Sequence, residues 1–143
     1  MEFLKGDLFK SGADALVNPV NCDGVMGKGL AKEFKLRWPE MYRTYQGWCG
    51  SAELRPGGVL IYKHSVPNII LFATKGNWRN PSRYEYIEEG LLQLKKELPT
   101  WLISSVAMPA IGCGLGGLEW SKVKVLIEKH LAGVSQKILV YEP

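Results

Sequence analysis

The amino-acid sequence predicts a single α/β domain, residues 1–143, with a largely parallel central sheet. Short apolar runs alternate with segments in which apolar residues recur every three or four positions, the patterns of strands and helices. Neighbouring parallel strands need a long crossover, which the helical segments supply. Two glycine-rich stretches, 18–29 and 112–117, each follow an apolar run and precede a helical pattern. They are therefore expected at the carboxyl ends of strands, where α/β sheets bind ligands.

The first half of the chain is predicted to contain four strands and two helices. Leu30, Phe34 and Trp38 recur at four-residue spacing and so mark one face of a helix. Pro39 ends that helix and starts a second one, since proline suits the first turn of a helix but not its interior. Runs of apolar and β-branched residues predict the strands, at residues 3–4, 15–17, 59–62 and 69–74.

The second half is predicted to contain two helices and two strands. Ser82 is the expected N-cap of the first helix, with Glu85 three residues later as its capping-box partner, and Pro99 is expected to end it. The core face of this helix is marked by Ile87, Leu91, Leu94 and Leu98. The remaining expected elements are a strand over 102–107, a helix that begins near Ser121 and a strand over 138–141.

The composition excludes several classes of protein. No apolar run approaches the roughly 20 residues that span a bilayer, and the N-terminus lacks the plan of a signal peptide. We therefore expect a cytoplasmic monomer without a membrane partner. Three cysteines without CxxC or Cys/His spacing argue against a disulfide framework or structural zinc. The net charge of +4 suits an anionic partner.

The two glycine-rich stretches have the build of anion-binding loops. Glycine lets backbone N–H groups approach a ligand closely, and a helix N-terminus adds unpaired donors and partial positive charge. Gly112, Gly114 and Gly117 match GxGxxG, but the dinucleotide fingerprint belongs in a first βα unit with an acidic residue about 20 positions later. We expect the loops to hold the two ends of one diphosphate; the alternative is that both are tight turns.

Lys75 is the candidate reactive residue, because it follows the predicted strand 69–74 and precedes Trp78, which is expected to line the site. It is either a solvated lysine at a strand end or an amine among apolar neighbours. In the second case desolvation lowers its pKa and favours the neutral, nucleophilic form. The two histidines, His64 and His130, have no partner signature and are expected at the surface.

The combined motifs resemble the macrodomain family over essentially the whole chain. The residues that carry the resemblance are Lys5-Gly6-Asp7-Leu8, the run ALVNPVNCDGVMGKGLA, Thr74-Lys75 and the run MPAIGCGLGGLEW. They look like one branch of that family, which holds terminal ADP-ribose protein glycohydrolase and the bacterial DNA ADP-ribosyl glycohydrolase antitoxins. The resemblance implies a three-layer α/β/α fold with a central mixed, largely parallel sheet.

The resemblance also implies a site for ADP-ribose. Lys75 matches the catalytic lysine of this branch, placed to attack the C1″ carbon of the distal ribose or to stabilise charge there. Asp7 is implied to accept the adenine amino group and Asn21 to contact the distal ribose. The ADP-ribose-binding residues that the resemblance implies are Asp7, Leu8, Asn21, Val25, Met26, Gly27, Lys28, Gly29, Ile111, Gly112, Cys113, Gly114, Leu115, Gly116 and Tyr141. No metal and no cofactor are implied.

Two departures from the family pattern bear on the substrate. Gly116 stands where the protein-type enzyme has an aspartate, as in the DNA-type enzymes, and Gly76-Asn77 replaces the Arg-His that commonly follows the lysine in the DNA type. The leading hypothesis is a hydrolase that removes ADP-ribose from single-stranded DNA or from protein, with DNA favoured and with a cognate ADP-ribosyltransferase toxin as a further candidate partner. The alternatives are a phosphatase of ADP-ribose 1″-phosphate or a deacetylase of O-acetyl-ADP-ribose, and a non-catalytic ADP-ribose reader.

Overall fold

A computed structural model describes all of residues 1–143, and its centre is one six-stranded sheet in the order β1-β6-β5-β2-β4-β3. Every neighbouring pair is parallel except β3 and β4, which are antiparallel. The strands are β1 Glu2–Leu4, β2 Ala15–Val20, β3 Val59–Tyr62, β4 Asn68–Ala73, β5 Ser105–Met108 and β6 Lys137–Tyr141. The prediction of a mixed, largely parallel sheet is therefore confirmed.

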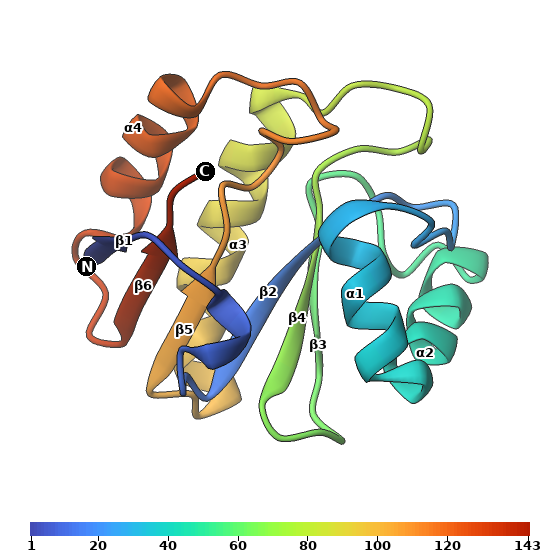
Figure 1. Ribbon diagram of the computed structural model, residues 1–143, viewed down its shortest axis with the longest axis horizontal. Helices are drawn as coiled ribbons and strands as arrows, with labels where there is room; N and C mark the ends of the chain where they lie inside the picture. The colour runs from blue at the N-terminus through green and yellow to red at the C-terminus, as the bar shows by residue number, and fades with distance from the viewer.

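Helices cover both faces of this sheet, so the molecule has three layers (Figure 1). The helices are α1 Gly29–Arg37, α2 Pro39–Gly50, α3 Tyr84–Trp101 and α4 Trp120–Leu131, with a short 3-10 turn, η1, at Leu8–Lys10. Buried residues of α1 and α2 belong to one hydrophobic cluster, and those of α3 and α4 belong to another. No helix is long and apolar enough to cross a membrane.

Strand β2 shows how the sheet separates the two clusters. Ala15 and Val17 pack in the cluster under α3 and α4, whereas Leu16 and Val20 pack in the cluster under α1 and α2. The alternation follows from the geometry of a strand, in which successive side chains point to opposite faces. A continuous apolar run is what a strand buried on both faces requires.

Strand β2 is longer than the predicted 15–17, because it continues through Pro19 to Val20. Proline is disfavoured inside a sheet, since it has no N–H to donate. Pairing of β2 with β5 ends at Leu16, while pairing with β4 continues to Val20. One edge of β2 is therefore unpaired at Pro19, and the strand tolerates the missing donor there.

The prediction that Ser82 caps α3 is wrong, because Arg83 is the N-cap residue and makes no side-chain capping bond. Ser82 is buried instead, and its hydroxyl donates to Thr74 Oγ1 at 3.1 Å. The Ser82 hydroxyl therefore bonds to Thr74, outside the helix, and does not cap α3. Ser82 joins the segment after β4 to the rest of the carboxyl edge of the sheet.

The end of α3 and the start of β5 also differ from the prediction. Pro99 lies inside α3, which continues to Trp101, and Leu102 N–H donates to the Pro99 carbonyl at 3.4 Å. Leu102 has a φ of 58° and is 92% exposed, so it cannot belong to an extended, buried strand. For this reason β5 begins at Ser105 and not at residue 102.

Candidate ligand-binding site

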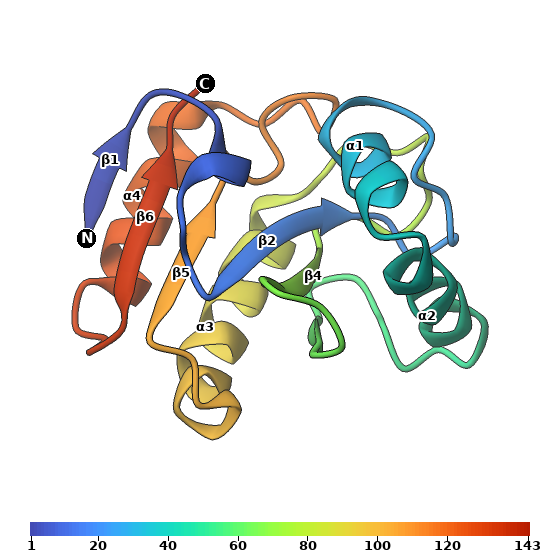
Figure 2. The same cartoon turned by 60° about the horizontal axis from the view of Figure 1, so that its bottom comes forward.

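One cavity of about 1090 Å³ lies where the carboxyl ends of the parallel strands meet. In Figure 2 the C-terminus, the loop between β5 and α4 and the start of α1 lie along the same upper edge of the molecule. The wall includes Lys75 and most of the predicted ligand-binding residues, namely Leu8, Asn21, Val25, Met26, Gly27, Lys28, Gly29, Gly112, Cys113, Gly114, Leu115, Gly116 and Tyr141. The prediction that both glycine-rich stretches and Lys75 converge on one edge of the sheet is confirmed.

Two of the predicted residues do not line the cavity. The Asp7 carboxylate is exposed and caps η1, where it accepts the N–H of Phe9 at 2.9 Å, although Leu8 beside it lines the wall. Ile111 is fully buried in the cluster under α3 and α4, although Gly112 beside it lines the wall. Their roles toward a ligand stay predictions.

The first glycine loop, residues 21–28, is held by Asn21 and Tyr45. Asn21 Oδ1 accepts the N–H of Asp23 at 3.0 Å, and its Nδ2 donates to the Val25 carbonyl at 2.9 Å. The fully buried Tyr45 hydroxyl lies 2.8 Å from the Asn21 carbonyl and 2.7 Å from its Oδ1. Burial raises the pKa of Tyr45, so the hydroxyl stays protonated and can donate. In this structure the Asn21 amide shapes the loop.

The first glycine loop runs directly into α1, whose first N–H groups have no partner in the protein. Lys28 is the N-cap residue and its side chain makes no capping bond. Gly29, Leu30 and Ala31 all line the cavity, and Lys32 is the first residue whose N–H donates within the helix, at 3.3 Å to the Lys28 carbonyl. Free donors and the partial positive charge of a helix N-terminus favour an anion at this place.

The second glycine loop, residues 109–119, connects β5 to α4 and is closed by its own backbone. Leu118 N–H donates to the Gly112 carbonyl at 3.0 Å, and Gly117 N–H donates to the Gly114 carbonyl at 3.2 Å. Gly112 has a φ of 75°, a conformation that side chains other than glycine rarely adopt. The loop therefore folds back on itself and presents its backbone.

Ser82 ties the second glycine loop to the segment after β4, and the loop leaves its remaining donors free. Ser82 N–H donates to the Gly116 carbonyl at 3.0 Å, whereas the N–H groups of Gly114, Leu115 and Gly116 have no partner in the protein. A Cβ on Gly116 would overlap both the Ser82 hydroxyl and the Gly112 carbonyl. The loop thus offers a concave run of backbone donors, a geometry that binds anions.

Lys75 directly follows β4 and reaches the cavity as a half-buried side chain. No carboxylate lies within ion-pair distance of its amine. Burial lowers the pKa of Lys75 below its usual value of 10.5, because an unpaired charged amine is disfavoured away from water. Of the two interpretations open from the sequence, the partial burial of Lys75 favours the desolvated amine.

Backbone bonds hold the segment after β4 against the first glycine loop. Cys22 N–H donates to the Gly76 carbonyl at 2.7 Å, and Trp78 N–H donates to the Asp23 carboxylate at 2.8 Å. In the segment after β4 both bonds are made by residues that follow Lys75, namely Gly76 and Trp78. The position of the amine is therefore coupled to the loop that carries the free donors of α1.

The charges in the wall are mostly positive. Lys28, Lys75 and Arg79 line the cavity, and Glu142 is the one acidic side chain in its wall. The Trp120 indole N–H and the Lys124 amine donate to Glu142 at 3.1 and 3.3 Å, and these contacts lower the pKa of that carboxyl. The charge of Glu142 is thus compensated, and the wall suits an anionic ligand.

The cysteine and histidine side chains do not provide an alternative reactive group. Burial raises the pKa of the Cys113 thiol to about 11, so it is protonated at neutral pH. His64 packs edge-on against Tyr62, and His130 lies 3.2 Å from a carboxylate of Glu88; neither lines the cavity. No group of three or more His, Cys, Asp and Glu side chains that could hold a metal ion occurs in the structure.

Several residues of the wall were not predicted from the sequence, among them Ser82, Arg79 and Trp120. The spacing of Ser82 and Glu85 predicted a helix cap at Ser82 and gave no indication of a cavity residue. Arg79 follows Trp78 directly, so its neighbour could have suggested it. Trp120 ends the run GCGLGGLEW and approaches the cavity because α4 begins there.

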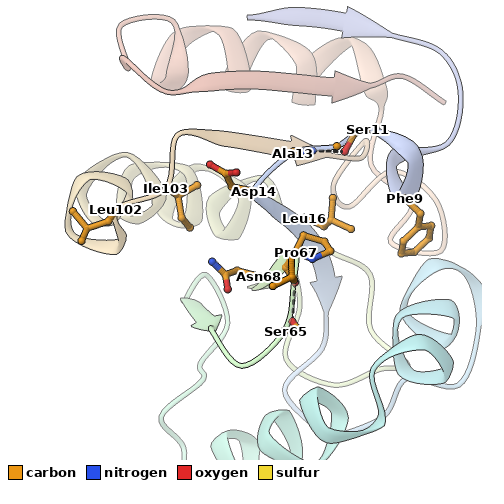
Figure 3. A pocket seen from close by; sticks show the side chains of 12 residues that line it. Phe9, Ser11, Ala13, Asp14, Leu16, Ser65, Pro67, Asn68, Leu102 and Ile103 are labelled. Atoms are coloured by element: carbon orange, nitrogen blue, oxygen red, sulfur yellow. Dashed lines mark hydrogen bonds between the residues drawn. The ribbon is translucent and has the colours of Figure 1, made fainter.

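A second cavity, of about 550 Å³, lies at the opposite, amino ends of the strands (Figure 3). Its polar groups are used within the protein: Ser11 accepts the Ala13 N–H and Ser65 donates to the Pro67 carbonyl. Hydrogen bonds from Ser104 lower the pKa of the Asp14 carboxyl. This cavity has no lysine or arginine in its wall, so the larger cavity is the candidate site.

Comparison with known proteins identifies relatives over the whole chain. The Macro domain family matches residues 17–127. A DNA ADP-ribosyl glycohydrolase of Thermus aquaticus is 39% identical over all of this chain and 41% of its own length. A DNA ADP-ribosyl transferase-DNA ADP-ribosyl glycohydrolase fusion protein of Thermosipho africanus is 35% identical over all of this chain and 42% of its own.

A solved structure of Thermosipho africanus DarTG in complex with ADP-ribose has the same fold, with a TM-score of 0.95 and 37% identity. The match covers 99% of this chain and 41% of the solved one. The chain thus spans about two fifths of the length of these bacterial relatives. It corresponds to the part of them that carries this fold.

Proposed function

The chain belongs to the macro domain family, and from that premise we propose that it binds ADP-ribose and hydrolyses its bond to a base of single-stranded DNA. The observation that carries the proposal is that two groups of unpaired backbone N–H donors lie at one cavity. Free N–H groups come from the start of α1 on one side and from Gly114–Gly116 on the other. A diphosphate held between them satisfies both sets without a metal ion.

The position of Lys75 supports a reaction at the far end of the ligand. Diphosphate binding at the two loops directs the distal ribose toward the segment after β4, where the amine lies. The neutral amine attacks C1″, and the base leaves with the bonding electrons and a proton. Water then hydrolyses the lysine adduct, which restores the free amine and releases ADP-ribose. The lowered pKa of Lys75 supports this role, because only the unprotonated amine is a nucleophile.

The backbone around Gly116 favours DNA over protein as the modified macromolecule. In the protein-type enzymes that the chain resembles, an aspartate occupies this position. Here a Cβ at Gly116 would overlap Ser82 and the Gly112 carbonyl, so no side chain fits without rearrangement of the loop. A mechanism that depends on a carboxylate at this point does not suit this backbone, and this supports Lys75 as the reactive group.

We further propose a source of the substrate, a location and an oligomeric state for the enzyme. A DNA ADP-ribosyltransferase must produce the substrate, and the transferase joined to the Thermosipho relative supports such a partner. We also propose that the reaction takes place in the cytoplasm. We propose a monomer, since residues of one chain form the cavity wall. The elution volume in size-exclusion chromatography, compared in the presence and absence of ADP-ribose, tests the monomer.

The direct test is release of ADP-ribose from mono-ADP-ribosylated single-stranded DNA, with mono-ADP-ribosylated protein, ADP-ribose 1″-phosphate and O-acetyl-ADP-ribose assayed in parallel. We expect turnover of the DNA to exceed that of the other three. Lys75→Ala should abolish turnover while calorimetry still detects ADP-ribose binding. Binding without turnover of any substrate by the unaltered protein would instead identify a reader, and faster turnover of either metabolite would reassign the reaction.

A further inference from the structure

We propose that Trp78 and Arg79 form a platform on which a nucleobase of the modified single strand stacks. The inference rests on the proposed function and adds the element that selects DNA as substrate. Both side chains line the cavity together with Lys75. They lie three and four residues beyond the amine, in the segment that follows β4.

Trp78 differs from the other tryptophans of the chain. Trp38 and Trp48 pack against the hydrophobic cluster under α1 and α2, and Trp101 and Trp120 pack against the cluster under α3 and α4. Trp78 belongs to neither cluster and is 46% exposed. An exposed indole at the edge of a ligand cavity has no part in the core, and its ring offers an aromatic face on which a base can stack.

Hydrogen bonds hold the backbone of the turn that carries the indole. Trp78 N–H donates to the Asp23 carboxylate at 2.8 Å, which fixes the residue against the first glycine loop. Asn77 Oδ1 accepts the Arg79 N–H at 2.9 Å, and its carbonyl accepts the Asn80 N–H at 3.0 Å. The turn that carries the indole is therefore formed before substrate binds, so stacking requires little ordering of the backbone.

Arg79 adds charge to this surface. Its guanidinium lies 4.9 Å from the centre of the Trp78 ring, a cation–π contact. No carboxylate is within ion-pair distance of it, so its charge is available to a phosphate of the strand. Aromatic rings that stack on bases, next to cations that contact the backbone, are how proteins hold single-stranded nucleic acid. An aspartate or glutamate of a modified protein has no aromatic ring to stack on the indole.

The test compares Trp78→Ala and Trp78→Phe with the unaltered protein on three ligands. These are a mono-ADP-ribosylated single-stranded oligonucleotide, a mono-ADP-ribosylated protein and free ADP-ribose. Stacking of one base corresponds to roughly a 5- to 150-fold effect on binding. We therefore expect Trp78→Ala to raise KM for the oligonucleotide by about tenfold or more, and Trp78→Phe to recover most of it. Kd for free ADP-ribose should change by less than about twofold in both variants.

Two controls separate stacking from loss of structure and from failure of the proposed function. Leu92→Ala removes a large exposed side chain on α3, away from the cavity, and should leave every value unchanged. Quenching of tryptophan fluorescence by an unmodified oligonucleotide measures stacking without turnover, and Trp78→Phe should remove it. If the unaltered protein shows this quenching but releases no ADP-ribose, the proposed function fails and the platform stands.

Four results would overturn the platform. The first is an unchanged KM for the oligonucleotide in Trp78→Ala. The second is an equal loss for free ADP-ribose, which would place the indole in the ADP-ribose site. The third is an equal loss for the modified protein, which would mean that the indole does not distinguish DNA. Absence of oligonucleotide quenching in the unaltered protein would have the same consequence.

Discussion

The backbone N–H of Trp78 donates to the Asp23 carboxylate at 2.8 Å, and this bond joins the segment that carries Lys75 to the first glycine loop. Asp23 belongs to the first glycine loop, and Trp78 belongs to the segment after β4. A second bond, from Cys22 N–H to the Gly76 carbonyl at 2.7 Å, joins the same two segments. The geometry of the amine relative to the free donors of α1 thus depends on contacts between residues about 55 positions apart.

Asp23→Ala should therefore lower kcat/KM on the modified oligonucleotide by about tenfold, because it removes a charge-assisted hydrogen bond that positions the reactive segment. The exposed carboxylate contributes little to stability, so the melting temperature should change by less than about 3 °C. Asp23→Asn is the control, since its amide oxygen can accept the same N–H. Equal activity in the alanine variant and the unaltered protein would show that this bond does not position Lys75.

Tyr45→Phe should destabilise the protein and loosen the first glycine loop. The change leaves the Asn21 carbonyl without the donor that now lies 2.8 Å away in a fully buried position, a loss of about 1–3 kcal/mol. Thermal unfolding should show a lower melting temperature, and calorimetry should show weaker ADP-ribose binding. Tyr86→Phe is the matched control, because the Tyr86 hydroxyl makes no hydrogen bond in the structure and lies on α3 outside the cavity.

Gly116→Ala should disrupt the second glycine loop. Its Cβ would overlap the Ser82 hydroxyl and the Gly112 carbonyl, and overpacking of this kind costs about 1–3 kcal/mol. We expect a melting temperature lower by about 2–10 °C and weaker binding of ADP-ribose. In Gly114→Ala, by contrast, the new Cβ has no neighbour within 4 Å, so the melting temperature should stay close to that of the unaltered protein. Equal melting temperatures for both variants would show that the loop can open around Gly116.

The lowered pKa of Lys75 predicts how activity depends on pH. Since the neutral amine is the nucleophile, the rate should fall as pH is lowered through the pKa of Lys75 and should reach a plateau above it. Arginine stays charged throughout, so Lys75→Arg should be inactive at every pH. A pH–rate profile of kcat/KM measures both. Substantial activity in Lys75→Arg would assign Lys75 an electrostatic role in place of a covalent one.

The same shift predicts a change in stability at alkaline pH. Because the pKa of folded Lys75 is below 10.5, the unfolded chain binds more protons than the folded one between the folded value and 10.5. The free energy of unfolding therefore receives a contribution that rises with pH across that interval. Lys75→Met should lose this contribution, which denaturant titration at a series of pH values can detect. An identical pH dependence in both proteins would contradict the lowered pKa.

The elements that are marked by regularly spaced apolar residues or by a proline break were predicted well from the sequence. The break between α1 and α2 at Pro39 and the apolar face of α3 follow from local rules, and both are confirmed. The predictions that Ser82 caps α3 and that Pro99 ends it were wrong, since a serine or a proline near a helix end can occupy more than one position. The Ser82 hydroxyl bonds to Thr74, eight residues away, and no local pattern encodes that contact.

By itself the sequence determined the alternation of strands and helices, the two loops whose glycines expose backbone, and the place of Lys75 directly after a strand. These depend on steric freedom and side-chain periodicity, which are properties of neighbouring residues. The tertiary structure decided which donors stay free, that no side chain fits at Gly116, that Lys75 is desolvated and that Trp78 stays outside both clusters. Hydrogen-bond pairing and burial depend on atoms that folding brings from distant parts of the chain, so these properties exist only once the sheet has aligned the carboxyl ends of its strands.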